Sequence, residues 1–188
     1  MSKEGLRTTG YVVAALLLVV ASAWIQPEAV SPEMFSDQGE PLFPQFRDVL
    51  AVKSIEIVDY NEAQAAAIPL KVEFRKGRWV LASHFDYPAE AEDRLSRTAA
   101  ALFGLRKDEV VSDRIEAQPE YGLIDPLDTS NPLLTGRGKR VTLRDAHGAA
   151  VADVILGKPV PNREGYRYVR LPDSNRIYAV KTDADPSA

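Results

Sequence analysis

The two histidines are the side chains best suited to acid–base catalysis or metal binding. His84 and His147 lie far apart in the chain, and neither has a second histidine at the His-x-x-x-His or His-Glu-x-x-His spacing of a zinc site. Ser83, His84 and Asp86 carry the side chains of a hydrolase triad, but such close neighbours in one strand or loop rarely converge on one substrate atom. We therefore expect a polar loop at this point and assign no catalytic, metal-binding or cofactor-binding residue.

The basic segment Gly136–Arg140 matches a phosphate-binding loop only in part. Position 133 is Leu where the first glycine of that motif stands, and Arg140 replaces its Ser or Thr. We expect a solvated loop that leads into a strand. The carboxylates at Glu90, Glu92 and Asp93 are predicted to lie at a helix end rather than across a cleft, as a glycosidase pair would require.

Tyr166, Tyr168 and Arg170 alternate in a predicted strand and so share one side of it. They are the candidate binding face of the chain, suited to sugars or to a peptide edge. The alternative is that the aromatic rings pack on cross-strand neighbours, as aromatic residues in strands commonly do.

Composition limits the elements that position these residues. The chain has 188 residues, 45% hydrophobic and 27% charged, with a net charge of 23 − 27 = −4 and no cysteine. The length suits one domain or two small ones, and the acidic balance argues against nucleic-acid binding. Without cysteine, disulfides and thiolate zinc sites are excluded.

The run Tyr11–Ile25 is apolar except for Ser22 and predicts a short transmembrane signal-anchor, with Tyr11, Leu17, Trp24 and Ile25 as its anchor residues. Residues 1–10 carry Lys3 and Arg7 and form the cytoplasmic flank, so the rest of the chain is expected to lie outside the inner membrane. The alternative is a cleaved signal peptide, because Ala21, Ser22 and Ala23 give the small-x-small pattern and would leave a periplasmic protein.

Residues 26–47 contain four prolines and predict a spacer, although Met34, Phe35, Leu42, Phe43 and Phe46 have the character to dock on a domain. An α+β domain is expected over residues 48–182, followed by a tail at 183–188. Alternation of apolar and polar residues predicts a mostly antiparallel sheet of about seven or eight strands. One main amphipathic helix is expected from Ala89 to about Leu105, and the loop region from Glu116 to Gly138.

Several short motifs in a fixed order resemble the bacterial domain of unknown function numbered 4340. The motifs are Gly77–Leu81, Asp86–Ala89, Val110–Asp113, Tyr121–Leu123 with Asp125 and Pro126, Val154–Lys158, Tyr168–Arg170 and Tyr178–Val180. The resemblance implies a membrane-anchored extracytoplasmic protein that often accompanies ABC transporter components of the gliding-motility type. It supplies no catalytic residues, and it implies that related chains commonly continue beyond this point.

These observations favour a non-enzymatic accessory or scaffold subunit of an ABC-type envelope transport system. One alternative is an extracytoplasmic binding module for envelope polymer, which uses the Tyr166 and Tyr168 face. A second alternative is an unrecognised hydrolase that depends on His84. No cofactor and no nucleic-acid partner are expected, and the oligomeric state is left open.

Overall fold

The computed structural model describes residues 11–13, 15, 16, 19, 37–81, 87, 88, 92–182 and 184. The chain forms two compact units, Met1–Met34 and Phe35–Ala188. In the first unit, Tyr11 and its described neighbours are helical and exposed, whereas Leu17, Trp24 and Ile25 lie outside the described residues. Among the residues that the structure describes, no helix has the length and apolar character that a membrane crossing requires.

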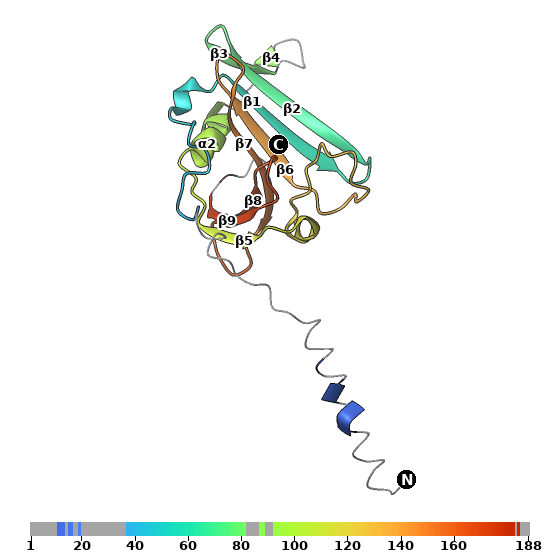
Figure 1. Ribbon diagram of the computed structural model, residues 1–188. Helices are drawn as coiled ribbons and strands as arrows, with labels where there is room; N and C mark the ends of the chain where they lie inside the picture. The colour runs from blue at the N-terminus through green and yellow to red at the C-terminus, as the bar shows by residue number, and fades with distance from the viewer. Residues whose placement is uncertain are drawn as a thin grey trace, which may run out of the picture. The chain divides into compact units, whose positions relative to one another are not determined.

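The second unit is a β-rich α+β domain built on one nine-stranded antiparallel sheet (Figure 1). The strand order is β4-β3-β2-β1-β6-β7-β8-β9-β5. The strands are β1 (Ser54–Asn61), β2 (Ala66–Arg75), β3 (Arg78–Leu81), β4 (Tyr87–Pro88), β5 (Glu109–Ser112), β6 (Lys139–Arg144), β7 (Ala150–Pro159), β8 (Tyr166–Arg170) and β9 (Ile177–Lys181). The helical elements are η2 (Val49–Ala51), α2 (Glu92–Leu102), η3 (Ile115–Ala117) and α3 (Gln118–Tyr121).

The backbone conformation of two residues explains the tight turn between β2 and β3. Lys76 and Gly77 connect β2 to β3 with φ of 50° and 80°, the two positive values that a tight turn matched to strand twist requires. β3 pairs with β2 only over Val72–Arg75. The outer edge of Ala66–Lys71 therefore has no paired strand among the described residues, and Pro69, which has no N–H to donate, lies in this stretch.

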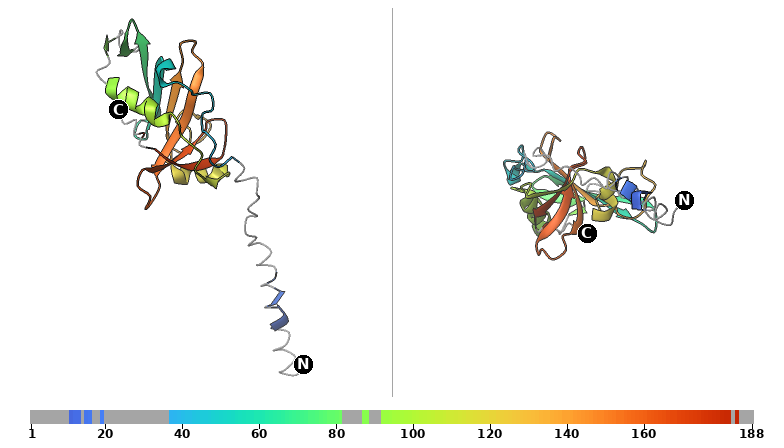
Figure 2. Two further views of the ribbon diagram at one scale, coloured as in Figure 1. Left: turned by 90° about the vertical axis from the view of Figure 1, so that its left-hand side faces the viewer. Right: turned by 60° about the horizontal axis from the view of Figure 1, so that its bottom comes forward.

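The helix is shorter than its sequence pattern predicts. Pro88, directly before the predicted helix start at Ala89, lies in β4 opposite Val80, and the sheet has nine strands where seven or eight were predicted. α2 ends at Leu102 because Gly104 adopts a left-handed φ of 77°, so Leu105 lies beyond the helix. The predicted apolar side of the helix is nevertheless buried at Thr98, Ala99 and Leu102. Figure 2 shows α2 alongside the sheet.

Residues 37–47, which belong to the segment predicted as a spacer (26–47), lie in the second compact unit. Leu42, Phe43 and Phe46 are buried, as the docking alternative requires, and Phe46 meets the Phe103 ring edge-on at 5.3 Å. Met34 and Phe35 lie outside the described residues. We call residues 37–46 the strap.

Backbone hydrogen bonds and one carboxylate fix the strap to the domain. Leu42 N–H donates to the Leu105 carbonyl at 2.7 Å, and Gly39 N–H donates to the Lys107 carbonyl at 2.8 Å. The Asp37 carboxylate accepts from the Tyr178 hydroxyl at 2.6 Å and from Lys107 Nζ at 3.0 Å. The prolines indicate poor helix and strand propensity, but they do not show whether nearby apolar side chains pack on the domain. The composition therefore does not predict these contacts.

Candidate interaction surface

The three residues with the side chains of a hydrolase triad, Ser83, His84 and Asp86, lie outside the described part of the chain. His147 is exposed in the β6–β7 turn, where the Asp145 carboxylate accepts its backbone N–H at 2.8 Å. Among the described residues there is no cluster of three or more His, Asp or Glu side chains placed to hold a metal ion.

The predicted binding face on β8 is only partly accessible. Tyr166 is half-buried, and the Arg163 guanidinium lies 3.9 Å from the centre of its ring. Tyr168 packs against Tyr121 with ring centres 4.6 Å apart, beside the core formed by Leu123, Ile155 and Ile177. Tyr168 therefore packs on α3 rather than on a cross-strand neighbour, and the segment that carries Tyr121 covers this side of the strand.

Arg170 requires a correction, because only 5% of its surface is exposed. Its Nε donates to the Leu123 carbonyl at 3.2 Å, and its Nη1 donates to the carbonyls of Leu171, Pro172 and Ser174 at 3.0 to 3.2 Å. Burial lowers the pKa of this guanidinium. Arg170 thus holds the β8–β9 turn and the chain after α3, and it is not part of an exposed basic face.

The Gly136–Arg140 segment is a tight backbone crossing. A Cβ at Gly136 would lie 2.6 Å from the Pro119 carbonyl oxygen, and one at Gly138 would lie 2.5 Å from the Ile155 side chain. The Gly138 N–H is already donated to the Ile124 carbonyl. The glycines therefore permit close packing of the chain against the sheet.

Arg137 organises the loop that precedes this crossing, residues 125–137, which we call the leucine loop. Its Nη1 donates to the carbonyls of Asp125 and Asp128, both at 2.9 Å. Its Nη2 donates to the Asn131 carbonyl at 2.8 Å, and its Nε donates to the Leu133 carbonyl at 3.0 Å. One planar guanidinium thus ties four successive parts of a loop that has no helix or strand of its own.

Side-chain oxygens brace the same loop from within. Asp125, Asp128 and Asn131 each accept the N–H two residues ahead, at 2.8, 2.9 and 3.0 Å, in three consecutive Asx turns. The hydrogen bond from the Ser130 side chain is the main cause of a lowered pKa at Asp128, so this carboxylate is ionised at neutral pH. The loop is therefore preorganised rather than free to adopt many conformations.

One ion pair fixes the leucine loop to the sheet, and a second holds its arginine in place. Arg140 of β6 reaches Asp125 at 2.9 Å and Asp153 of β7 at 2.7 Å, and the Asp153 carboxylate also accepts from Thr142 at 3.0 Å. The Asp153 hydrogen bond raises the pKa of Arg140. These side chains are one-quarter exposed or less, so solvent screens the pairs less than it screens surface pairs.

The side chains that this rigid loop presents to solvent include three leucines. Leu127, Leu133 and Leu134 are 49%, 45% and 46% exposed. Beside them, the loop and the free end of the β1–β2 hairpin enclose the loop-side groove, of about 350 Å³, lined by residues that include Tyr60, Ala67 and Leu134. Arg137 also lies 4.4 Å from the centre of the Tyr60 ring, so the same guanidinium joins loop and hairpin.

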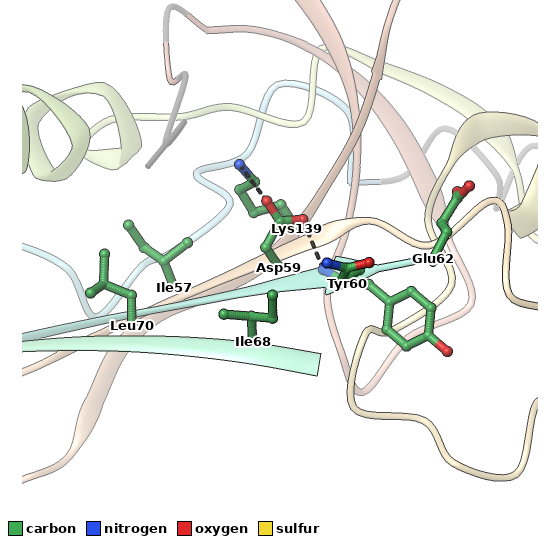
Figure 3. A pocket seen from close by; sticks show the side chains of 8 residues that line it. Ile57, Asp59, Tyr60, Glu62, Ile68, Leu70 and Lys139 are labelled. Carbon is green, nitrogen blue, oxygen red and sulfur yellow. Dashed lines mark hydrogen bonds and ion pairs between the residues drawn. The ribbon is translucent and has the colours of Figure 1, made fainter. Parts of the chain in front are cut away.

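A second hollow, the sheet-side groove, also lies at this end of the hairpin (Figure 3). It measures about 460 Å³, and Ile57, Ile68 and Leu70 form its apolar part. Asp59 and Lys139 form an ion pair at 3.0 Å on its border, and Glu62 also lines it. In Figure 3 the Tyr60 ring points away from Ile57 and Leu70.

Sequence patterns do not identify this surface because the leucine loop contains prolines and polar residues, which signal only a turn-rich segment. The usable signal is the spacing of Asp125, Asp128 and Asn131, each two residues before a hydrogen-bonded N–H, together with an arginine at the end of the loop. The exposure of the leucines has no sequence signature.

Comparison with known proteins places this domain in a family without giving it an activity. No curated protein and no solved structure matches the sequence. The model of a domain of unknown function, DUF4340, matches residues 79–187, which run from Trp79 of β3 past the end of β9 and include the whole leucine loop. Because this match covers more than half of the 188 residues, the chain belongs to the DUF4340 family.

Proposed function

We propose that this protein is a non-enzymatic accessory subunit of an envelope transport system, and that it docks a partner protein through the leucine loop. The observation that carries the proposal is the combination of a rigid loop with an apolar exterior. Four hydrogen bonds from Arg137 and the ion pair of Arg140 with Asp125 hold the loop, yet Leu127, Leu133 and Leu134 remain about half exposed. A preordered apolar surface loses little entropy on binding, which favours a docking role.

The second part of the proposal is the location. We propose that Tyr11–Ile25 anchors the chain in the inner membrane and that the domain lies outside it, where an ABC-type transporter presents its extracytoplasmic segments. The motivation is the apolar run itself and the family resemblance. Residues 26–36 then span at most about 40 Å when fully extended.

Quantitative co-purification tests the docking role. Full-length protein is purified from detergent-solubilised membranes as wild type, as Leu127→Ser/Leu134→Ser, and as the control Leu50→Ser, which alters an 82% exposed leucine in η2. We expect one transporter component to follow the wild type and the control, and to decrease at least about tenfold with the loop variant. Equal recovery with all three proteins would refute the leucine loop as the docking site.

A second candidate function is binding of envelope polymer, which the stacking of Arg163 on the half-buried Tyr166 ring favours. Tyr166→Ala is the suitable variant, because Tyr168 packs against Tyr121 and its removal would disturb the core. This hypothesis predicts that Tyr166→Ala decreases co-sedimentation with purified cell-wall material while the unfolding curve stays in place. Unchanged sedimentation would exclude it.

A further inference from the structure

One side of the sheet loses its cover toward the outer strand of the β1–β2 hairpin. A row of apolar residues crosses β2, β1, β6 and β7 on this side, formed by Leu70, Ile57, Val141 and Val154. Val141 and Val154 are fully buried and Ile57 is 7% exposed, whereas Leu70 is only half-buried. The cover of the apolar side therefore decreases from β7 to β2.

The next row toward the free end of the hairpin is covered still less. Ile68 of β2 lies opposite Asp59 of β1 and is 47% exposed. It is two residues from Leu70, so both side chains lie on the same side of β2, beside Ile57 in the sheet-side groove (Figure 3). Strand β2 thus keeps the apolar alternation of a covered strand at a position where the described part of the chain supplies only partial cover.

The charged groups that line this groove carry a net negative charge. They are Asp59, Glu62 and Lys139, so one ammonium group stands against two carboxylates. Asp59 engages the Lys139 ammonium at 3.0 Å. Glu62 is exposed and has no ionic partner within the described part of the chain. The charge left over at the border of the groove is therefore that of the Glu62 carboxylate.

This charge distinguishes the surfaces that could complete the cover. A second copy of the chain would bring the same carboxylates, and the anionic headgroups of a bilayer would bring phosphates, so both would place like charges near Glu62. A protein segment that carries an apolar side chain beside lysine or arginine meets both requirements. Its apolar group removes Ile68 and Leu70 from water, and its cation is complementary to Glu62.

We propose that the sheet-side groove binds a segment of a partner protein in which an apolar side chain stands next to lysine or arginine. The apolar side chain packs against Ile57, Ile68 and Leu70, and the cation faces Glu62. The groove measures about 460 Å³, within the range of about 300 to 1,000 Å³ that is typical of binding pockets. The site is distinct from the leucine loop and does not depend on the docking role proposed for that loop.

Short synthetic peptides with blocked ends test both requirements on the full-length protein in uncharged detergent micelles. The probe is Gly-Lys-Leu-Lys-Gly, and its controls are Gly-Glu-Leu-Glu-Gly with reversed charge and Gly-Lys-Gly-Lys-Gly without the apolar group. NMR follows the backbone amides of Asp59, Glu62, Ile68 and Leu70. We expect the probe to shift these amides saturably at about millimolar concentration, and each control to bind at least about fivefold more weakly. Equal binding of all three peptides, or no shift with any of them, would overturn the proposal.

Substitution of Glu62 tests the position of the cation. Glu62→Gln should weaken binding of the probe about threefold. Glu116→Gln is the matched control, because it alters a 70% exposed glutamate that does not line the groove, and it should leave binding unchanged. Glu62→Lys reverses the sign of the charge at the border, so Gly-Glu-Leu-Glu-Gly should then bind more tightly than the probe. If the order of the two peptides stays the same in Glu62→Lys, the cation does not face Glu62 and the proposal fails.

The same amides report on the other possible occupants. If they shift when the protein alone is concentrated, a second copy occupies the groove, and if they shift on addition of phosphatidylglycerol, a lipid does; either result would overturn the proposal. Leu127 and Leu134 do not line the sheet-side groove, so Leu127→Ser/Leu134→Ser should bind the probe as the wild type does, even if it no longer recovers a transporter component. A loss of probe binding in this variant would contradict the assignment to the sheet-side groove.

Discussion

Removal of the Arg137 fork should loosen the leucine loop without unfolding the sheet. In Arg137→Met, four carbonyl oxygens lose a hydrogen bond to a charged donor, and the Tyr60 ring loses its cation. Hydrogen bonds to charged groups contribute about 1.5 to 3 kcal/mol each when buried, so a simple sum would be about 6 to 12 kcal/mol. Water can reach carbonyls in a surface loop, and the four bonds share one side chain, so we expect about 2 to 4 kcal/mol of local stability to be lost.

Amide hydrogen exchange measures this loss residue by residue. The reporters are the N–H groups of Leu127, Ser130 and Leu133, which are donated within the loop to Asp125, Asp128 and Asn131. At about 1.4 kcal/mol per factor of ten, their exchange should accelerate by about 30- to 1,000-fold. Amides in the centre of β6 and β7 should exchange as in the wild type, because the sheet does not depend on the loop.

Two variants separate the roles of charge and shape. Arg137→Lys keeps the charge but cannot reach four carbonyls at once, so it should resemble Arg137→Met. Arg144→Met removes an arginine of β6 whose side chain donates to the Gly148 carbonyl in the β6–β7 turn, and it should leave the loop amides protected. If loop exchange in Arg137→Met equals that of the wild type, the Asx turns alone hold the loop and Arg137 does not organise it.

Two further predictions concern packing and pH. Gly157→Ala should lower the free energy of unfolding in urea by about 1 to 3 kcal/mol, because the new Cβ would overlap the Tyr121 carbonyl oxygen and lie 2.9 Å from the Leu123 side chain. An unchanged midpoint would show that this chain crossing can shift at no cost. Burial would by itself raise the pKa of Asp37, but the bonds from Tyr178 and Lys107 and the charge of Arg176 together lower it. The stabilisation is thus present above the ordinary Asp pKa and is lost as the pH falls through the lower folded value, so Asp37→Asn should be less stable at neutral pH and should show a flatter acid limb in urea titrations. Parallel acid limbs for the two proteins would place the pH dependence elsewhere.

The strands could be predicted because one side of each has to be apolar. Ile55 and Ile57 alternate with Glu56 in β1, and both isoleucines are buried. The sheet order and the covering of Arg170 could not be predicted, because they depend on contacts between segments more than 40 residues apart, such as the bond from Arg170 to Leu123.

The interaction surface was beyond prediction for a different reason. In the sequence, Arg137 is one member of a basic cluster. The identity of the residue does not show whether its side chain is solvated or binds the carbonyls of a loop. Only the positions of four carbonyls around it distinguish the two cases. The strap shows the reverse case. Its prolines indicate a spacer, but Leu42, Phe43 and Phe46 are buried in the core.

The strap also determines how mechanical force would enter the domain. Among the residues that the structure describes, a pull on the chain from its N-terminal side first reaches the Asp37 carboxylate, which Tyr178, Lys107 and Arg176 bind. Tyr178 and Arg176 belong to β9 and to the turn before it, so the load passes directly into the sheet and bypasses η2 and β1. If the first unit is anchored in a membrane, a force applied through the strap would act on β9, and the domain would resist that force as a rigid body.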